Sequence, residues 1–365
     1  MNKLRIAVIG AGHLGRIHAK LLGQVDGAEL VAVCDPGESA RQTATESFGV
    51  PVLADYTEII DRIDAAVIAA PTDFHSDIAK TLLKAGKHLM IEKPLAADGS
   101  DAQRLAILAA ARKLTLQVGH VERFNPAFVA LGELAQDVKY VEAVRASSFP
   151  GRCLDVGVVM DLMIHDLDLV LSMTDAPVTS VSSSGLSVIS DHEDIAETRI
   201  EFQCGLVANL KASRISPTPA RSMQVFGSHG FAEIDFGAPA LSVVRPADSV
   251  VDRSFDLQAE TDNPLRYSGE LFSTRLRCET LDLEPRNAIL DELHDFVLSV
   301  QTGSTPVVDG SAGARAVTVA DKVLQSIEQR AWYSDASFSE CGAHALVRES
   351  VQSASRRFHQ SRRAA

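Results

Sequence analysis

The sequence predicts an α/β domain built on a parallel sheet, followed by an α+β domain with an open, mostly antiparallel sheet. A chain of 365 residues is longer than one ordinary hydrophobic core usually serves, which favours two domains. The first 120 residues alternate strand-like and helix-like segments, as a parallel sheet flanked by helices requires. After about residue 140, period-two segments separated by turn signals take over. We expect domains at residues 1–122 and 123–333, and a basic, flexible extension at 334–365.

The first domain alternates apolar and helical segments in a regular order. The apolar segments lack a polar face, which is typical of strands covered on both sides, and we expect strands at Leu4–Ile9, Leu30–Cys34, Ala66–Ala69, His88–Ile91 and Thr115–Val118. Between them we expect helices that include Arg16–Leu22, Ser76–Ala85 and Gly99–Ala111.

The second domain reads as consecutive strands joined by tight turns. The expected strands are Val178–Ile189, Glu197–Gln203, Leu206–Ser213, Ser222–Phe226 and Ala232–Phe236. Gly and Pro clusters between them favour hairpins, and hairpins make an antiparallel sheet. Two closing helices are expected at Asn287–Val300 and Ser311–Gln329.

Charge and cysteine content exclude several classes of protein. The net charge of −13 argues against nucleic acid or an anionic membrane as the main partner, and no apolar run is long enough to span a membrane. The start of the chain lacks a secretory signal, so we expect a cytoplasmic protein. Five scattered cysteines, without a Cys-x-x-Cys pair, indicate neither a disulfide framework nor a zinc site. The tail after Cys341 carries five arginines and one acid, and we interpret it as frayed or disordered, with a partner contact as the alternative.

A glycine fingerprint follows the first expected strand and opens the first helix. Gly10 permits a tight turn, Gly12 lets the backbone approach a pyrophosphate, and Gly15 lets the helix pack closely on the strand. Asp35 ends the second strand, 20 residues after Gly15, where a carboxylate accepts hydrogen bonds from ribose hydroxyls. Because a carboxylate repels a 2′-phosphate, we expect a Rossmann domain that binds NAD rather than NADP.

Two later strands end in polar segments, at the edge of the sheet where ligands bind in open α/β folds. Ala70-Pro71-Thr72 ends one strand, with His75 one turn into the next helix, and Glu92-Lys93-Pro94 ends the following strand. Pro94 keeps Lys93 out of helical geometry. We therefore place Lys93 at the crevice, against the alternative of a solvated loop lysine.

Residues 155–170 place one histidine and four carboxylates among apolar residues. In a helix, Asp161, His165 and Asp168 follow at i, i+4 and i+7 and share one stripe. Buried ionisable groups must be paired, and they cluster where chemistry is done. A core histidine capped by aspartates is the competing interpretation.

These motifs together resemble the Gfo/Idh/MocA family of oxidoreductases, over nearly the whole chain to about Tyr333. The resemblance implies that Lys93, Asp161 and His165 line the site where an alcohol carbon meets the nicotinamide. It implies cofactor contacts from Gly10, Gly12, His13, Leu14, Gly15, Asp35, Ala70, Pro71, Thr72, His75, Glu92, Lys93 and Pro94. It also implies a homodimer or homotetramer formed through the second sheet.

Two segments resemble a branch of the family that acts on UDP-N-acetylglucosamine or its uronic acid. These are the lead into the second motif, from Arg152 to Val159, and Gly119-His120-Val-Glu122-Arg123-Phe-Asn125-Pro126. The resemblance implies NAD-dependent oxidation of the sugar at C3. Alternatives are a dehydrogenase of a free sugar or polyol such as inositol, and a non-catalytic NAD-binding regulatory protein.

The chemistry needs a proton acceptor and a donor to the substrate oxygen. A histidine titrates near ~6.5 and a lysine near ~10.4, so we favour His165 as acceptor and Lys93 as donor, with the reverse assignment open. Asp161 would fix the tautomer of His165. Substrate contacts are expected from Lys93, Arg123, Asn125, Arg152, Asp161 and His165. Lys211 and Arg214 are further candidates for binding the diphosphate. Asn125 could alternatively start the turn before Pro126. No cluster has metal-ligand spacing, so no metal is expected.

Overall fold

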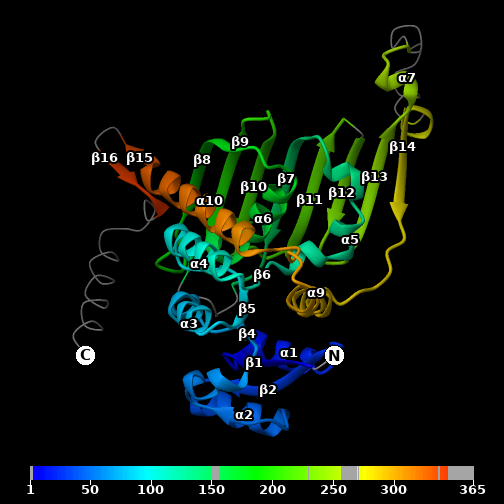
Figure 1. The fold of residues 1–365 in the computed structure, drawn as a ribbon. Coiled ribbons are helices and arrows are strands. Elements are labelled where there is room, and N and C mark those ends of the chain that lie inside the picture. Colours follow the sequence, from blue (N-terminus) through cyan, green and yellow to red (C-terminus); the bar gives the residue numbers. More distant parts are fainter. Residues whose placement is uncertain are drawn as a thin grey trace.

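The computed structural model describes residues 3–149, 156–228, 230–255, 269, 271–335 and 338–343. Figure 1 shows two sheets, one formed by the first part of the chain and one by the second. The first has six strands and the second has eight. This arrangement confirms the predicted fold class.

The first sheet is parallel and has the strand order β3-β2-β1-β4-β5-β6. Its strands are β1 (Leu4–Ile9), β2 (Ala28–Cys34), β3 (Val52–Leu53), β4 (Ala65–Ile68), β5 (His88–Glu92) and β6 (Leu116–Gly119). The connecting helices are α1 (His13–Leu22), α2 (Glu38–Ser47), η1 (Tyr56–Arg62), α3 (Thr72–Lys84) and α4 (Gly99–Arg112). β1 lies in the middle, paired with β2 on one side and β4 on the other, so the turns after β1, β4 and β5 adjoin at one edge.

The second sheet is mixed, with the order β14-β13-β12-β11-β7-β10-β9-β8. Its strands are β7 (Val138–Ala146), β8 (Val178–Leu186), β9 (Ile195–Phe202), β10 (Val207–Ser213), β11 (Ala220–Gly227), β12 (Gly230–Asp235), β13 (Ala240–Pro246) and β14 (Leu276–Leu281). β7 was not predicted from the pattern. It lies between β10 and β11 and runs parallel to β10, which makes the sheet mixed rather than a simple series of hairpins.

Short helical segments join the two sheets and cover the second one. η2 (Val121–Phe124), α5 (Pro126–Val129) and η3 (Gly132–Ala135) lead from β6 to β7, and η4 (Val159–Met163) and α6 (Ile164–Ser172) lead to β8. α6 contacts both β7 and β10. Its apolar residues, such as Leu167 and Leu171, are buried there. Beyond β13 lie α7 (Asp248–Val251) and η5 (Leu271–Arg275), and the described part of the chain ends in the hairpin β15 (Ala331–Asp335) and β16 (Phe338–Cys341).

The two closing helices return to the first sheet. α9 (Ala288–Thr302) packs against α1 and η2, and α10 (Gly310–Gln329) contacts α4 on one side and α6 and β8 on the other. Figure 1 shows α10 crossing in front of the second sheet, above α4. A bridge between Gln117 of β6 and Asp309 adds a backbone link. The closing helices therefore connect the second part of the chain to the first sheet. The domain limits proposed from the sequence stay a prediction.

Neither a membrane-spanning helix nor a metal-binding cluster is found in the part of the chain that the structure describes. No helix there is long and apolar enough to cross a membrane. No group of three or more His, Cys, Asp or Glu side chains there could hold a metal ion. The basic tail beyond residue 343 lies outside the described residues.

Candidate active site

The glycine turn after β1 is built so that two of its glycines cannot carry a side chain. Gly10 has φ +99°, and a Cβ there would lie 2.5 Å from the backbone of Ala69 at the end of β4. A Cβ on Gly15 would lie 1.8 Å from the carbonyl oxygen of Gly10. At Gly12 the position of a Cβ is open, with no atom within 4 Å. The backbone at Gly12 is thus free to be approached closely by a ligand.

The start of α1 presents unpaired N–H groups beside this open space. Gly12, His13 and Leu14 are exposed, and no side chain caps the helix. A helix N-terminus of this kind favours an anion such as a pyrophosphate. These residues therefore fit the phosphates of a dinucleotide.

Asp35 follows β2 and is hydrogen-bonded to the glycine turn. Its Oδ2 accepts a hydrogen bond from the backbone N–H of Ala11 at 2.7 Å, and its Oδ1 accepts one from the N–H of Gly37 at 2.7 Å. Each carboxylate oxygen can accept a second bond. Asp35 is therefore held in place and retains acceptor capacity for ribose hydroxyls.

His75 ties together the segments that follow β4 and β5. It is buried, with Nε2 2.8 Å from the carbonyl oxygen of Ala70 and Nδ1 2.9 Å from that of Pro94. Pro71 precedes α3 and Thr72 is its first residue. Since these contacts occupy both ring nitrogens, we expect His75 to shape the crevice rather than to bind the cofactor through its nitrogens.

Glu92 ends β5 and pairs with a buried histidine. Its Oε1 lies 2.6 Å from Nε2 of His18 on α1, and its Oε2 accepts a hydrogen bond from the N–H of Lys93 at 3.2 Å. Burial alone would raise the pKa of Glu92, but the bond to His18 and the nearby charges hold it below the ordinary value. Glu92 therefore anchors the segment that carries Lys93.

Lys93 reaches from the first sheet to the segment before α6. Its Nζ donates to the carbonyl oxygen of Asp161 at 2.6 Å and lies 3.2 Å from Oδ1 of the same residue. The Lys93–Pro94 peptide bond is cis. Lys93 and Asp161, which are 68 positions apart, meet here. The structure thus brings together Lys93 and Asp161, which the family resemblance placed in one site.

The segment that carries Asp161 is a π-helical turn, not the regular helix expected from the spacing. η4 spans Val159–Met163, and α6 begins at Ile164. The wider turn disturbs the i, i+4 stripe on which Asp161 and His165 were placed. Nδ1 of His165 is buried without a hydrogen-bond partner. The prediction that Asp161 fixes the tautomer of His165 is therefore wrong, because its carboxylate pairs with Lys93 instead.

His165 is partly exposed and lies in positive surroundings. Burial, followed by the charges of Lys93 and Arg145, lowers its pKa well below the usual value of 6.5. The ring is therefore neutral at pH 7 and able to accept a proton.

Beneath α6, Arg145 of β7 lies between two carboxylates. Its Nη2 donates to Oδ1 of Asp166 at 2.7 Å, and its Nη1 donates to Oε1 of Glu122 at 2.7 Å. All three residues are buried, and the paired carboxylates raise the pKa of Arg145 against the effect of burial. This triad joins α6, β7 and η2 and fixes the helix that carries His165.

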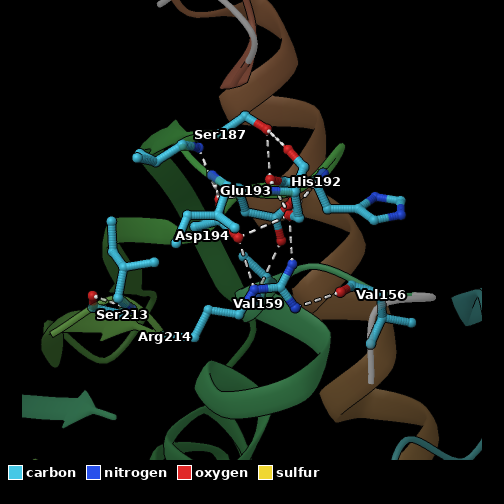
Figure 2. Close-up of polar contacts among 12 residues, drawn as sticks. Val156, Val159, Ser187, His192, Glu193, Asp194, Ser213 and Arg214 are labelled. Atoms are coloured by element: carbon cyan, nitrogen blue, oxygen red, sulfur yellow. Dashed lines mark hydrogen bonds and ion pairs between the residues drawn. The ribbon is translucent and has the colours of Figure 1, made fainter. Parts of the chain in front are cut away.

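A second buried cluster, which we call the latch, holds the chain where it enters η4, and Figure 2 shows it. The latch consists of Arg214, Asp194 and Glu193. Nε of Arg214 donates to Oδ1 of Asp194 at 2.9 Å, and Nη1 of Arg214 donates to the carbonyl oxygen of Val156 at 2.8 Å. Oε1 of Glu193 accepts a hydrogen bond from the N–H of Val159 at 3.1 Å. The first turn of η4 is thereby tied to the loop before β9.

Family models match both parts of the chain. The model described as "Oxidoreductase family, NAD-binding Rossmann fold" matches residues 4–120, and the model described as "GFO/IDH/MocA C-terminal domain" matches residues 138–233. The chain belongs to the Gfo/Idh/MocA family. It is an oxidoreductase, and its first domain is an NAD-binding Rossmann domain, as the fingerprint predicted.

Relatives within the Gfo/Idh/MocA family act on different substrates. UDP-N-acetylglucosamine 3-dehydrogenase of Acidithiobacillus ferrooxidans is 33% identical, and the match covers 90% of this chain and 98% of that protein. Its solved structure gives a TM-score of 0.78 and covers 89% of this chain and 98% of that one. Inositol 2-dehydrogenase of Rhizobium meliloti is 26% identical, with 90% and 98% covered.

Two of the cations expected to bind a diphosphate have other positions in this family member. Arg214 is fully buried in the latch, so it is not a substrate contact. Lys211 is exposed on β10, on the face opposite its buried neighbour Leu210. Arg152 lies outside the described residues.

Two further substrate candidates already have partners within the protein. Nε of Arg123 lies 3.1 Å from Oδ2 of Asp168 in an ion pair. Oδ1 of Asn125 accepts from the N–H of Ala127, and its amide nitrogen donates to Glu122. The alternative for Asn125, a turn before Pro126, is confirmed because Asn125 caps α5, and its substrate contact stays a prediction.

Several residues that shape the site were missed from the sequence. They are Glu122, Arg145, Asp166, Glu193 and Asp194, whose partners lie far away in the chain, and His120, whose ring lies edge-on to His165. For His120 a signal was present, because it follows an expected strand directly within the quoted Gly119-His120 motif. For the ion pairs no local pattern showed which charges would be buried.

Proposed function

We propose that this protein oxidises the C3 hydroxyl of UDP-N-acetylglucosamine to the 3-keto sugar nucleotide with NAD⁺. The observation that carries the proposal is the contact of Lys93 with Asp161, which brings an amine to the segment of His165 at the carboxyl ends of the strands. The relative with this activity, 33% identical over nearly its whole length, supports the choice of substrate.

In this mechanism the side chains handle the proton and orient the hydroxyl. Gly10, Gly12 and Asp35 would hold NAD⁺, which when bound would supply the hydride acceptor for the oxidation at C3. Lys93 donates a hydrogen bond to the substrate oxygen and stabilises its developing negative charge. His165, neutral at pH 7, accepts the hydroxyl proton. Asp161 orients the Lys93 amine.

A second candidate is oxidation of a free polyol such as inositol. It is favoured by the complete burial of Arg214, which removes one candidate cation for a diphosphate, and by the inositol dehydrogenases among the relatives. A dehydrogenase of UDP-N-acetylglucosaminuronic acid would use the same site. The substrate assay below separates these candidates.

The test is reduction of NAD⁺ by purified protein with UDP-N-acetylglucosamine, followed by absorbance of NADH. A parallel reaction contains an α-keto acid to reoxidise cofactor that stays bound, and its product is identified by mass spectrometry. We expect loss of two hydrogens from the sugar nucleotide. Turnover with inositol or glucose and none with UDP-sugars would overturn the substrate assignment and favour the second candidate.

Replacement of the two proton-handling residues tests their roles. Lys93→Ala and His165→Ala should each lower kcat/KM by about 100-fold or more, with NAD⁺ affinity by calorimetry unchanged. With His165 as the acceptor, kcat/KM rises with pH through a pKa below 6.5 and is flat above it. A rate that keeps rising towards alkaline pH would favour Lys93 as the base, and full activity of either variant would refute the role given to that residue.

We also propose that the open face of the second sheet forms a dimer or tetramer interface. Three aromatic residues cluster there, with the rings of Phe226 and Phe231 stacked at 4.5 Å and Tyr140 5.5 Å from Phe226. Light scattering of the purified protein, and of a Phe231→Asp variant, tests this. A monomer in the unmodified protein would contradict it.

A further inference from the structure

His120 is a second histidine at the proposed site, and it is almost completely buried. It follows β6 and is 1% exposed. Its ring lies at 90° to that of His165, with 6.4 Å between the ring centroids. Neither Nδ1 nor Nε2 of His120 has a hydrogen-bond partner. Burial of two unpaired nitrogens costs free energy, so a residue in this state points to a functional reason.

Other unpartnered atoms gather around the same ring. In the part of the chain that the structure describes, nine buried side-chain polar atoms lack a hydrogen-bond partner, and five of them belong to four residues of this site: His120, His165, Arg123 and Asp168. Arg123 and Asp168 face each other as an ion pair but are not aligned for a hydrogen bond. Because these unpartnered atoms belong to neighbouring residues, we infer that a polar group or an ordered water molecule forms hydrogen bonds with them.

The charges around the two histidines differ. Burial lowers the pKa of His120, and Lys93 and Arg123 add to this, but the carboxylates of Asp168 and Glu92 oppose it. His165 is influenced by burial and by positive neighbours, of which Lys93 and Arg145 come first. An imidazolium is therefore better supported at His120 than at His165.

We propose that His120 receives the proton that His165 takes from the substrate. The inference rests on the proposed function, in which His165 is the first acceptor. The substrate O–H bond breaks as a bond to Nε2 of His165 forms, and the proton on the buried Nδ1 leaves that ring. It passes to a ring nitrogen of His120, where the Asp168 carboxylate stabilises the cation. The ring centroids are 6.4 Å apart, so the proposed relay includes one water molecule between the two rings.

The kinetic test compares His120→Asn with the unmodified enzyme in H₂O and D₂O. Asparagine keeps hydrogen-bonding groups but takes up no proton. We expect kcat to fall about tenfold or more and the solvent isotope effect on kcat to increase, with KM and NAD⁺ affinity within twofold. Asp168→Asn should change kcat and the isotope effect in the same direction. His294→Asn, an exposed histidine on α9, is the matched control and should change nothing.

Two outcomes would overturn the relay. One is a kcat within twofold of the unmodified enzyme. The other is a lower kcat with an unchanged solvent isotope effect, because that would reflect packing alone.

A substrate-independent measurement separates failure of the relay from failure of the proposed function. In NMR titrations of the ring carbons, Asp168→Asn should lower the pKa of His120, because it removes a facing carboxylate. If the unmodified enzyme does not oxidise UDP-N-acetylglucosamine, the substrate assignment fails, whereas this titration still tests whether Asp168 supports a proton on His120. A His120 titration that does not respond to Asp168→Asn would overturn the relay.

Discussion

The first domain holds its half of the site with backbone geometry, whereas the second domain holds its half with buried ion pairs. Around the glycine turn, Gly10 and Gly15 are needed because no side chain fits there. Around η4 and α6, the backbone is fixed by Arg145 between Asp166 and Glu122 and by Arg214 with Asp194. Lys93 and Asp161 join the halves.

This difference determines how each half can fail. A close approach of backbones fails when volume is added, and it responds little to pH or salt. A buried ion pair fails when one partner is removed or neutralised, because the other charge is left in a medium of low polarity. The same active site therefore has one half sensitive to added methyl groups and one half sensitive to lost charges.

The largest effect is expected from Arg145→Met. The substitution keeps an apolar stem of similar length and leaves two buried carboxylates without a cation, so it should lower the free energy of unfolding by about 3–5 kcal/mol. Urea denaturation measures it. Arg104→Met is the control, since Arg104 pairs with Asp101 on the exposed surface of α4, and it should cost no more than about 1 kcal/mol. Equal losses in the two variants would contradict the division of the site into two kinds of support.

The next prediction concerns two glycines of the turn, one needed for stability and the other for binding NAD⁺. Gly15→Ala places a Cβ 1.8 Å from the Gly10 carbonyl oxygen, and we expect a loss of about 1–3 kcal/mol in stability as the backbone shifts. Gly12→Ala meets no protein atom within 4 Å, so its stability should change by no more than about 0.5 kcal/mol while NAD⁺ binding weakens at least about tenfold. Calorimetric titration with NAD⁺ measures the second effect. Unchanged affinity in Gly12→Ala would show that the cofactor does not pass over this glycine.

The first half of the site could be predicted because its chemistry is local in sequence. The expected strand Leu4–Ile9 is observed with the same limits, and Gly10, Gly12, Gly15 and Asp35 all fall within one strand-turn-helix-strand unit. The Rossmann pattern therefore carries its own structural context.

The second half could be predicted only in part, because its partners are brought together by the fold. The pattern placed Asp161 and His165 on one segment but not the π-helical turn that separates their roles. Arg214 looked like a free cation at a strand end, and only the loop that returns with Asp194 shows that it is buried. β7 was missed although it lies in the middle of the second sheet, and it carries the buried Arg145.

The smallest effect is a loss of stability at low pH, and it tests whether the latch depends on charge. Burial alone would raise the pKa of Asp194, but hydrogen bonds from the N–H groups of Ile189, Ser190 and Val188 and from Arg214 hold it below its ordinary value of 3.8. A carboxylate with a depressed pKa in the folded state contributes stability above its unfolded pKa, and this contribution is lost as pH falls towards the folded value.

We therefore expect the free energy of unfolding to fall by about 1 kcal/mol between pH 5 and pH 3 because of Asp194 alone. Asp194→Asn should remove this part of the pH dependence, in addition to its constant loss of stability. Ser190→Ala deletes one hydroxyl donor but keeps the carboxylate, so it should retain most of the pH dependence. The opposite outcome is a free energy of unfolding of Asp194→Asn that differs between pH 5 and pH 3 by as much as that of the unmodified protein. The latch would then be stabilised by packing, like the glycine turn, and not by charge. That result would contradict the contrast between the two halves of the site.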